Sequence, residues 1–361
     1  MALKIAVVGV GFGTAVHVPA FLSEGLEVIG IMARRPERAA EAASKFGIEH
    51  ALSDFEQLLA LPGLDAVSIA TPPAFHRDMA IAALQAGLHV ICEKPFALNS
   101  AEAREMMEVA TASNKTAMVA HEFRFASGRA FVKQLLENGY IGTPRIAYAR
   151  LVRGPRDVAP EQTPEYRPER DSAALGAGFL FGLGSHYIDG LRHWFGEVAE
   201  VSGTLLSTSP ERRGEDGAVR ADADDTFSFT LSFESGVVAE MVATRAAPFI
   251  EESVLSVHGD RGSIVTPQTG FNPPAHGVVL AGRLGVDSGL ERLVVPSELQ
   301  PFEDARDDRL MPFRLFTRAF VRGVEEGSSS EPSFYDGFRC QQVLDALRQS
   351  ARSGALVPIP A

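Results

Sequence analysis

The sequence predicts an α/β protein: an N-terminal Rossmann domain with a doubly wound parallel sheet, then a C-terminal α+β domain with a largely antiparallel open sheet. Two observations predict this fold class. Between residues 3 and 119, short apolar runs alternate with amphipathic stretches, as in a parallel sheet that helices cover on both faces. Beyond residue 145, alternating runs separated by short turns indicate antiparallel hairpins. The chain has 361 residues, 45% of them hydrophobic, enough for two domains with separate cores.

The first domain is placed at residues 1–122. Its expected strands, with helical segments between them, are 4–10, 27–33, 65–71, 88–93 and 116–121.

The second domain is placed at residues 123–361 and begins with a helix at 126–137. The segment 226–233 alternates strictly, with Phe227, Phe229, Leu231 and Phe233 on one face, which indicates a strand in a sheet with unequal faces. The runs 237–243, 253–258 and 263–266 continue the sheet as hairpins, and two helices, 311–325 and 335–350, close the chain.

Three polar segments of this domain are expected to face solvent. The stretches 153–170 and 210–225 are expected to be loops, and the first of them is a candidate cover for a substrate. Arg314, Arg318 and Arg322 recur every four residues on the helix 311–325, and we expect them to form a solvated face.

Charge and cysteine content narrow the class of partner. The formal net charge of −12 argues against a nucleic-acid surface, which needs clustered Lys and Arg, and favours a small-molecule partner. Cys92 and Cys340 are too few for a disulfide framework or a zinc site and are expected to be reduced thiols. The first strand begins close to Met1 and no apolar run has membrane-spanning length, so we expect a cytoplasmic protein without membrane association or bound metal.

The segment from Gly9 to Thr14 follows an apolar strand and opens a helix. Gly9, Gly11 and Gly13, with Phe12 and Thr14, are therefore candidates for a dinucleotide site, where backbone N–H groups bind the pyrophosphate. The usual pattern is G-x-G-x-x-G, but here its last position is Thr14. A purely structural glycine turn is the alternative.

The end of the second strand bears on cofactor choice. An NAD-selective site usually places a carboxylate there, but this chain has Ala33, Arg34 and Arg35. Because a guanidinium can pair with a 2′-phosphate, NADP(H) is favoured over NAD(H). The alternative is that both arginines simply lie on an exposed turn.

The segment TPPAFH, residues 71–76, is expected to form a strand-to-helix turn on the cofactor side of the sheet. Thr71 and Pro72 are candidates to line the dinucleotide. His76 is grouped with them but is assigned no chemical role.

Four segments, in this order and spacing, give the chain a resemblance to the Gfo/Idh/MocA oxidoreductase family over nearly its whole length. They are GVGFGTAVHVPAF at 9–21, TPPAFH at 71–76, CEKPFAL at 92–98 and GLGSHYIDGLRHWFGE at 182–197. The resemblance implies a nicotinamide-dependent oxidoreductase of sugars, polyols or cyclitols that forms a homodimer or homotetramer through its C-terminal sheet.

The resemblance also implies site residues. Lys94, joined to Pro95 by a bond that is often cis in the family, matches the active-site lysine, expected to contact the substrate oxygen and the cofactor. Glu93, which precedes it, is placed with the cofactor-binding residues. His186 matches the histidine that moves the carbinol proton, a role that suits imidazole. Arg124 matches a segment near the cofactor and substrate.

One position departs from the family pattern. Where the family has an aspartate four residues before the histidine, this chain has Gly182, so the group that would orient His186 is missing. Asp189, three residues after His186, is a candidate replacement and substrate contact, as are Glu169 and Asp171 in the preceding loop. Two alternatives to a standard dehydrogenase stay open: a cofactor-binding sensor that has lost catalysis, and an enzyme that reduces and reoxidises a tightly held nicotinamide within each turnover.

Overall fold

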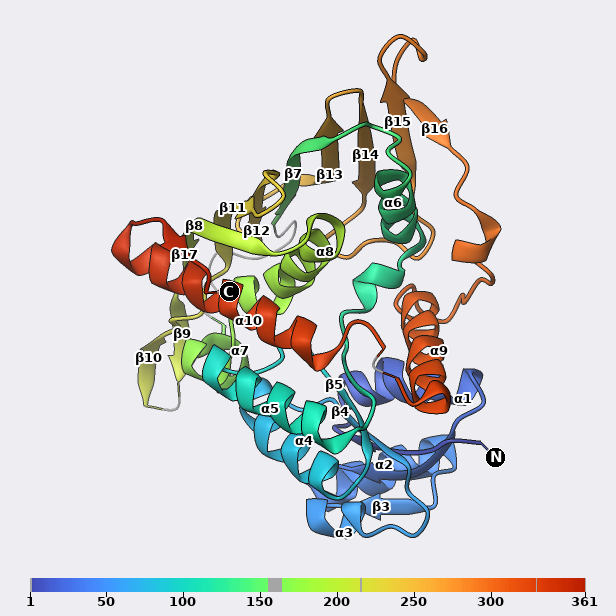
Figure 1. Cartoon of the computed structure of the whole chain (residues 1–361). Helices are drawn as coiled ribbons and strands as arrows, with labels where there is room; N and C mark the ends of the chain where they lie inside the picture. Colours follow the sequence, from blue (N-terminus) through green and yellow to red (C-terminus); the bar gives the residue numbers. More distant parts are fainter. Residues whose placement is uncertain (1, 155–163, 215, 329, 361) are drawn as a thin grey trace. The chain divides into compact units, whose positions relative to one another are not determined.

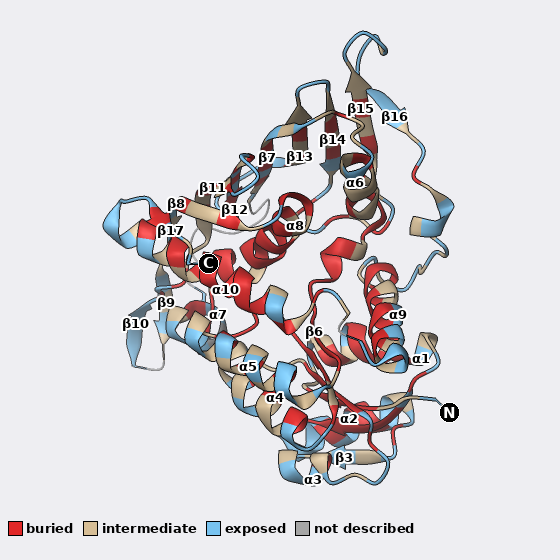
Figure 2. Cartoon of the chain, in the orientation of Figure 1, coloured by how far each residue is buried: buried red, intermediate tan, exposed pale blue. Residues whose placement is uncertain are grey.

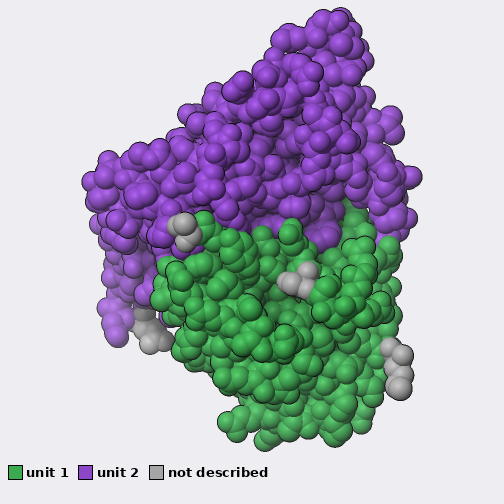
Figure 3. Space-filling view, viewed as in Figure 1, with its two compact units in different colours: residues 1–122, 304–341 green, residues 123–303, 342–361 purple. Residues whose placement is uncertain are grey.

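A computed structural model of the chain describes residues 2–154, 164–214, 216–328 and 330–360. The chain divides into two compact units, one of residues 1–122 and 304–341, the other of residues 123–303 and 342–361 (Figure 3). Residues 304–341 thus group with the N-terminal unit, whereas the sequence placed them in the C-terminal domain. The domain boundaries at 1–122 and 123–361 stay a prediction, and this division differs from them in that one segment.

The first unit contains a six-stranded parallel sheet of strand order β3-β2-β1-β4-β5-β6, of which β3, β4 and β5 are labelled in Figure 1. This is the order of doubly wound folds, in which ligands bind beyond the carboxyl ends of the strands, where the winding reverses. The strands are β1 Lys4–Val8, β2 Glu27–Met32, β3 His50–Leu52, β4 Ala66–Ile69, β5 His89–Cys92 and β6 Ala117–Val119. The sequence predicted all but β3, whose three residues are too short and too exposed to give an apolar run.

The helices of this unit are α1 Val18–Ser23, α2 Pro36–Phe46, α3 Phe55–Leu59, α4 His76–Gln85, α5 Ser100–Ser113 and α9 Leu310–Glu326. Their ends follow ordinary capping chemistry. Asn99 accepts a hydrogen bond from the backbone of Glu102 at 3.0 Å at the start of α5, and Gly47 ends α2 in the left-handed conformation. The first residues of α10, Phe334–Ser353, also belong to this unit.

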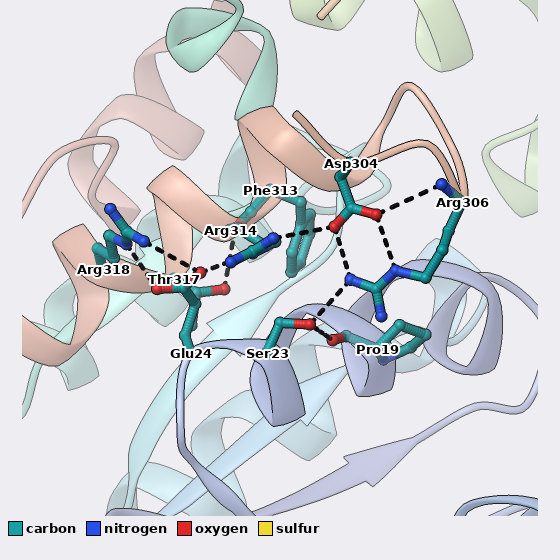
Figure 4. Close-up of polar contacts among 9 residues, drawn as sticks. All are labelled: Pro19, Ser23, Glu24, Asp304, Arg306, Phe313, Arg314, Thr317 and Arg318. Atoms are coloured by element: carbon teal, nitrogen blue, oxygen red, sulfur yellow. Dashed lines mark hydrogen bonds and ion pairs between the residues drawn. The ribbon is translucent and has the colours of Figure 1, made fainter. Parts of the chain in front are cut away.

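Two arginines of helix α9 form ion pairs with Glu24, the buried carboxylate that directly follows α1 (Figure 4). The Glu24 carboxylate accepts from Arg314 at 2.6 Å and from Arg318 at 2.5 Å, and Arg314 also reaches Asp304 at 3.0 Å. The Arg314 side chain is only 16% exposed. The expectation of a solvated arginine face is therefore wrong for Arg314, because Glu24, just after α1, and Asp304, before α9, are carboxylate partners that the local pattern does not reveal.

The second unit contains a nine-stranded mixed sheet of order β16-β15-β14-β13-β7-β12-β11-β8-β17. All of its neighbouring pairs are antiparallel except β7 and β12, which are parallel. Along β11, apolar residues are buried and the Thr and Ser residues between them are not, as the alternation predicted (Figure 2). The strands are β7 Pro144–Arg153, β8 Val198–Leu206, β11 Thr226–Phe233, β12 Val238–Thr244, β13 Glu251–Gly259, β14 Gly262–Gln268, β15 Val279–Arg283, β16 Glu291–Leu293 and β17 Val357–Pro358.

The helices of the second unit are α6 Ser127–Glu137, α7 Pro168–Asp171, α8 Ser185–Phe195 and the remainder of α10. Helix α8 is largely buried, and its Phe195 lies 5.5 Å from Phe233 of β11 between ring centroids. No helix among the described residues is long and apolar enough to cross a membrane.

The polar segment 210–225 is not wholly a loop. It contains a two-stranded antiparallel hairpin, β9 Glu211–Gly214 and β10 Gly217–Arg220. The strands carry charged residues and are largely exposed, so they lack the apolar alternation by which a strand is recognised. Half of the other expected loop 153–170, namely residues 155–163, lies outside the described residues.

Candidate active site

Three glycines in the turn after β1 meet three different steric requirements. Gly9 has a φ of +110°, and a Cβ there would collide with the carbonyl oxygen of Ala70. A Cβ on Gly13 would lie 2.9 Å from Cγ1 of Val7, so this glycine permits close packing of the helix on β1. At Gly11, no heavy atom of the described residues comes within 4 Å of such a Cβ. The backbone of Gly11 therefore faces open space at the carboxyl edge of the sheet, as close approach of a pyrophosphate requires.

Thr14 occupies the position of the usual third glycine. Its hydroxyl donates to the carbonyl oxygen of Val10 at 2.7 Å, within a helix that begins with a π turn, Gly13–His17. Gly13 takes the packing role of that glycine one residue earlier. Phe12 is part of the same turn. The guanidinium carbon of Arg309 lies 5.3 Å from the centre of the Phe12 ring.

The turn after β2 presents two cations. Ala33 is buried and donates its N–H to Leu52 at 3.1 Å, while Arg34 and Arg35 are exposed. Arg35 precedes Pro36, the first residue of α2. The geometry leaves both guanidinium groups accessible to a ligand beyond the carboxyl end of β2.

His76 ties the turn after β4 to the segment after β5. Its Nε2 lies 2.8 Å from the carbonyl oxygen of Thr71, and its Nδ1 lies 3.0 Å from that of Pro95. The side chain is fully buried, and this burial lowers the pKa of His76, against the opposing effects of the backbone carbonyls and of Glu93. His76 thus holds the Thr71 turn and the Lys94–Pro95 segment together, while the assignment of Thr71, Pro72 and His76 to a cofactor site stays a prediction.

Lys94 follows β5, and the Lys94–Pro95 bond is cis, as the family resemblance implied. Its backbone N–H donates to Glu93 Oε2 at 3.1 Å. The other oxygen of Glu93 lies 2.9 Å from His17 Nε2, and His17 Nδ1 lies 2.7 Å from the hydroxyl of Ser68. Sequence reasoning missed His17, although a histidine in the otherwise apolar stretch AVHVPAF was an available signal.

Two buried carboxyl groups, Glu93 and Glu122, have pKa values shifted in opposite directions. Burial alone would raise the pKa of Glu93, but the hydrogen bond and charge of His17, with the charge of Lys94, outweigh it and lower the pKa. Burial and the negative charge of Glu93 raise the pKa of Glu122 to about 8, while Lys94 and Arg309 act in the opposite direction. At neutral pH, these shifts favour the anion of Glu93 and the neutral acid of Glu122.

In the second unit, the His186 ring is buried and stacks on Phe123, with ring centroids 3.8 Å apart and planes 7° from parallel. A π turn, Leu180–Gly184, leads into its helix. A Cβ on Gly182 would meet no heavy atom of the surrounding described residues within 4 Å, so the position of the missing aspartate accepts a Cβ without a collision.

Asp189 forms a buried bidentate ion pair with Arg124. Arg124 Nη2 donates to Asp189 Oδ1 at 2.6 Å, and Arg124 Nε donates to Oδ2 at 2.7 Å. Both side chains are at most 4% exposed. Two residues that the sequence assigned separately, one to the cofactor and one to the substrate, are thus partners of each other, and their ligand contacts stay predictions.

Of the two loop carboxylates considered as replacements for the missing aspartate, the structure describes the side chain of Asp171 but not that of Glu169. Asp171 accepts from Arg212 Nε at 2.8 Å and from the backbone of Arg167 at 2.8 Å, so it anchors its own loop. The side chain of Glu169 lies outside the described residues.

Three features occur at one edge of the first unit: the strand order of a doubly wound sheet, a glycine turn that faces open space, and the buried hydrogen bonds that hold the segment of Lys94. Together they define a dinucleotide-dependent enzyme. Comparison with known proteins agrees. Residues 3–121 match the model "Oxidoreductase family, NAD-binding Rossmann fold", and residues 130–265 match the "GFO/IDH/MocA C-terminal domain". The chain belongs to the Gfo/Idh/MocA family and is a nicotinamide-dependent oxidoreductase.

Among its relatives is levoglucosan dehydrogenase of Pseudarthrobacter phenanthrenivorans, 28% identical over 99% of this chain and 98% of the relative. Myo-inositol 2-dehydrogenase of Thermotoga maritima is 28% identical over 93% and 92% of the two chains. The structure of a levoglucosan dehydrogenase in complex with NADH and levoglucosan superimposes with a TM-score of 0.86 at 26% identity, covering 100% of each chain.

Proposed function

We propose that this enzyme transfers hydride between C4 of a nicotinamide and the carbinol carbon of a sugar, polyol or cyclitol. The observation that carries the proposal is the open space before Gly11, at the same sheet edge as the buried network around Lys94, in a chain of this family. Levoglucosan dehydrogenase, D-glucoside 3-dehydrogenase and myo-inositol 2-dehydrogenase, all relatives of the chain, are named for substrates of these kinds.

We propose that the Lys94 ammonium contacts the reacting oxygen of the substrate. As hydride leaves a carbinol, negative charge grows on its oxygen, and a nearby ammonium stabilises that charge. Glu93 supports the role because its carboxylate, held by His17, accepts from the Lys94 backbone and fixes the segment that carries the ammonium.

We propose that His186 accepts the proton of the same hydroxyl group in oxidation and returns it in reduction. In oxidation, the C–H electron pair goes to the nicotinamide and the O–H proton to the imidazole; in reduction, both move in the opposite sense. The stack on Phe123 supports the role by fixing the plane of the ring without using its nitrogen atoms.

For the cofactor we propose NADP(H) in preference to NAD(H), with the pyrophosphate at Gly9 to Thr14 and the adenosine ribose at Ala33 to Arg35. The support is the absence of a carboxylate at residues 33–35 and the exposure of both arginines. A structural relative is described in complex with NADH, so fluorescence titration with both reduced cofactors is the direct test.

We propose that the enzyme forms a homodimer or homotetramer through the C-terminal sheet. The support is the exposed face of the neighbouring strands β7 and β12, where Tyr148 is 41% and Val242 45% exposed. Sedimentation of the parent chain and of the double variant Tyr148→Glu, Val242→Glu tests this proposed assembly.

The main experiment measures nicotinamide absorbance during turnover with a panel of sugars and cyclitols. We expect turnover by the parent chain, loss of at least a hundredfold in kcat for Lys94→Ala, and no change for Lys45→Ala, an exposed lysine of α2. Tight binding of both cofactors without turnover of any substrate would contradict the proposal.

Gly182 favours a second candidate, a cofactor-binding sensor. In that case, Lys94→Ala and His186→Ala leave the biological phenotype intact, while a change at Gly11 abolishes it. An enzyme that recycles a tightly held nicotinamide would instead retain it through purification and form product without net change in absorbance.

A further inference from the structure

Glu122 lies at the same sheet edge as Lys94 and has no role in the mechanism described above. It follows β6 by three residues, and the N–H of Ala120 donates to the carbonyl oxygen of Cys92 at 2.8 Å. The chain segments that leave β5 and β6 are therefore joined just before Lys94 and Glu122. The Glu122 residue is only 3% exposed.

The charged groups that act on Glu122 come from two other segments of the first unit. Glu93 and Lys94 follow β5, and Arg309 precedes α9, where Asp307 holds its guanidinium through two hydrogen bonds of 2.9 and 2.6 Å. His17 fixes Glu93 as the anion of the cluster. One ammonium thus lies in the field of two buried carboxyl groups, of which one is already charged.

We propose that Glu122 is a positioning residue for hydride transfer, acting through Lys94 as the uncharged member of its carboxyl pair with Glu93. The inference rests on the role of Lys94 in the proposed function. With Glu122 neutral, one carboxylate faces the ammonium, which keeps its capacity to stabilise charge on the substrate oxygen. When Glu122 ionises, a second buried anion competes for that ammonium and repels the developing alkoxide, so transfer slows.

The burial of Glu122 sets the pH range of this effect. Because its pKa is raised to about 8, the neutral form predominates at pH 7 and is lost above pH 8. We expect kcat/KM of the parent chain to fall roughly tenfold between about pH 7 and about pH 9.

The decisive variant is Glu122→Gln, which has the shape of the neutral acid and cannot ionise. We expect it to retain kcat/KM at pH 7 within about twofold and to lose the fall above pH 8. Glu108→Gln, which removes an exposed carboxylate from α5, is the matched control and should keep the parental profile. A parental profile in Glu122→Gln, or an equal loss of activity at every pH, overturns the proposal.

A second measurement does not depend on turnover. Infrared difference spectra of the parent chain should show the C=O band of a protonated carboxylic acid at pH 7 that disappears with an apparent pKa of about 8, and Glu122→Gln should lack that band. If the band is the same in both proteins, the proposal fails. If the band behaves as expected but no sugar is turned over by the parent chain, the proposed function fails and the ionisation of Glu122 stands by itself.

Discussion

His17 and Glu93 form a buried hydrogen bond of 2.9 Å between the helix after β1 and the residue before Lys94. His17 and Glu93 are 76 residues apart in sequence, and their contact connects the helix after the glycine turn to the segment that carries Lys94. A change at His17 should therefore affect both the stability of the first unit and the position of Lys94.

Replacing His17 with Ala leaves the Glu93 carboxylate buried without its imidazole partner. We expect a loss of about 3 kcal/mol in stability, since leaving a buried charged group without its hydrogen-bond partner costs roughly this much. His17→Asn, which keeps a donor, should lose less. Urea unfolding of both variants measures the difference, and equal stability of His17→Ala and the parent chain would contradict the argument.

Two glycines of the turn after β1, Gly11 and Gly13, should respond differently to replacement by Ala. Gly11→Ala should melt like the parent chain but bind NAD(P)H at least tenfold more weakly, because its Cβ fills space reserved for the cofactor. Gly13→Ala should lose about 1 to 3 kcal/mol of stability through overpacking against Val7. Thermal melting and fluorescence titration separate the two effects. Parental cofactor affinity in Gly11→Ala would exclude this turn as the pyrophosphate site.

The arginines after β2 give a test of cofactor choice. Arg34→Ala should weaken NADPH binding roughly tenfold, about 1.4 kcal/mol, and leave NADH binding within twofold, because only NADPH carries the 2′-phosphate. Arg38→Ala, an exposed arginine on α2, is the control. An equal loss of affinity for both cofactors would show that Arg34 does not bind the 2′-phosphate.

Features that depend on neighbouring residues in the chain were predictable from sequence. The alternation in β11 gave its buried face correctly, and the apolar runs gave five of the six parallel strands. The glycine turn was recognised because steric demands on a tight turn are met by one residue type. These signals are local, so no knowledge of distant partners was needed.

Features that depend on distant partners were not predictable. Arg314 looks like any exposed helical arginine until α1 brings Glu24 against it. Nothing in HEFRF marks Glu122 as a buried acid, because its burial and its neighbour Glu93 come from the pairing of β5 with β6. The pairing of Arg124 with Asp189 likewise joins segments 65 residues apart.

Gly182→Asp tests the effect of the missing aspartate on His186. A Cβ at Gly182 meets no surrounding atom, so we expect the variant to fold with a melting temperature close to that of the parent chain. If a carboxylate one turn before His186 orients the imidazole, kcat should rise roughly tenfold. Gly289→Asp, which adds the same charge at an exposed position in β15–β16, should change neither. Unchanged kcat in a folded Gly182→Asp would mean that this chain orients His186 by other means, or does not use it.

The α1–α9 ion pairs allow buried and exposed arginines to be compared within one helix (Figure 4). Arg314→Met leaves Glu24 and Asp304, whose side chains are 8% and 4% exposed, short of a partner, and we expect a loss of about 3 kcal/mol.

Arg318 contacts the same carboxylate but is 46% exposed, so Arg318→Met should cost less than about 1 kcal/mol. The stability of Arg314→Met relative to the parent chain should also depend on pH. Hydrogen bonds from Arg306 and then Arg314 lower the pKa of Asp304 to about 2, so its contribution to stability is present above its ordinary pKa and is lost as the pH falls toward 2. The deficit of Arg314→Met relative to the parent chain should therefore shrink between about pH 4 and pH 2. Urea midpoints over this range measure it, and a constant deficit would show that Arg314 acts by packing alone.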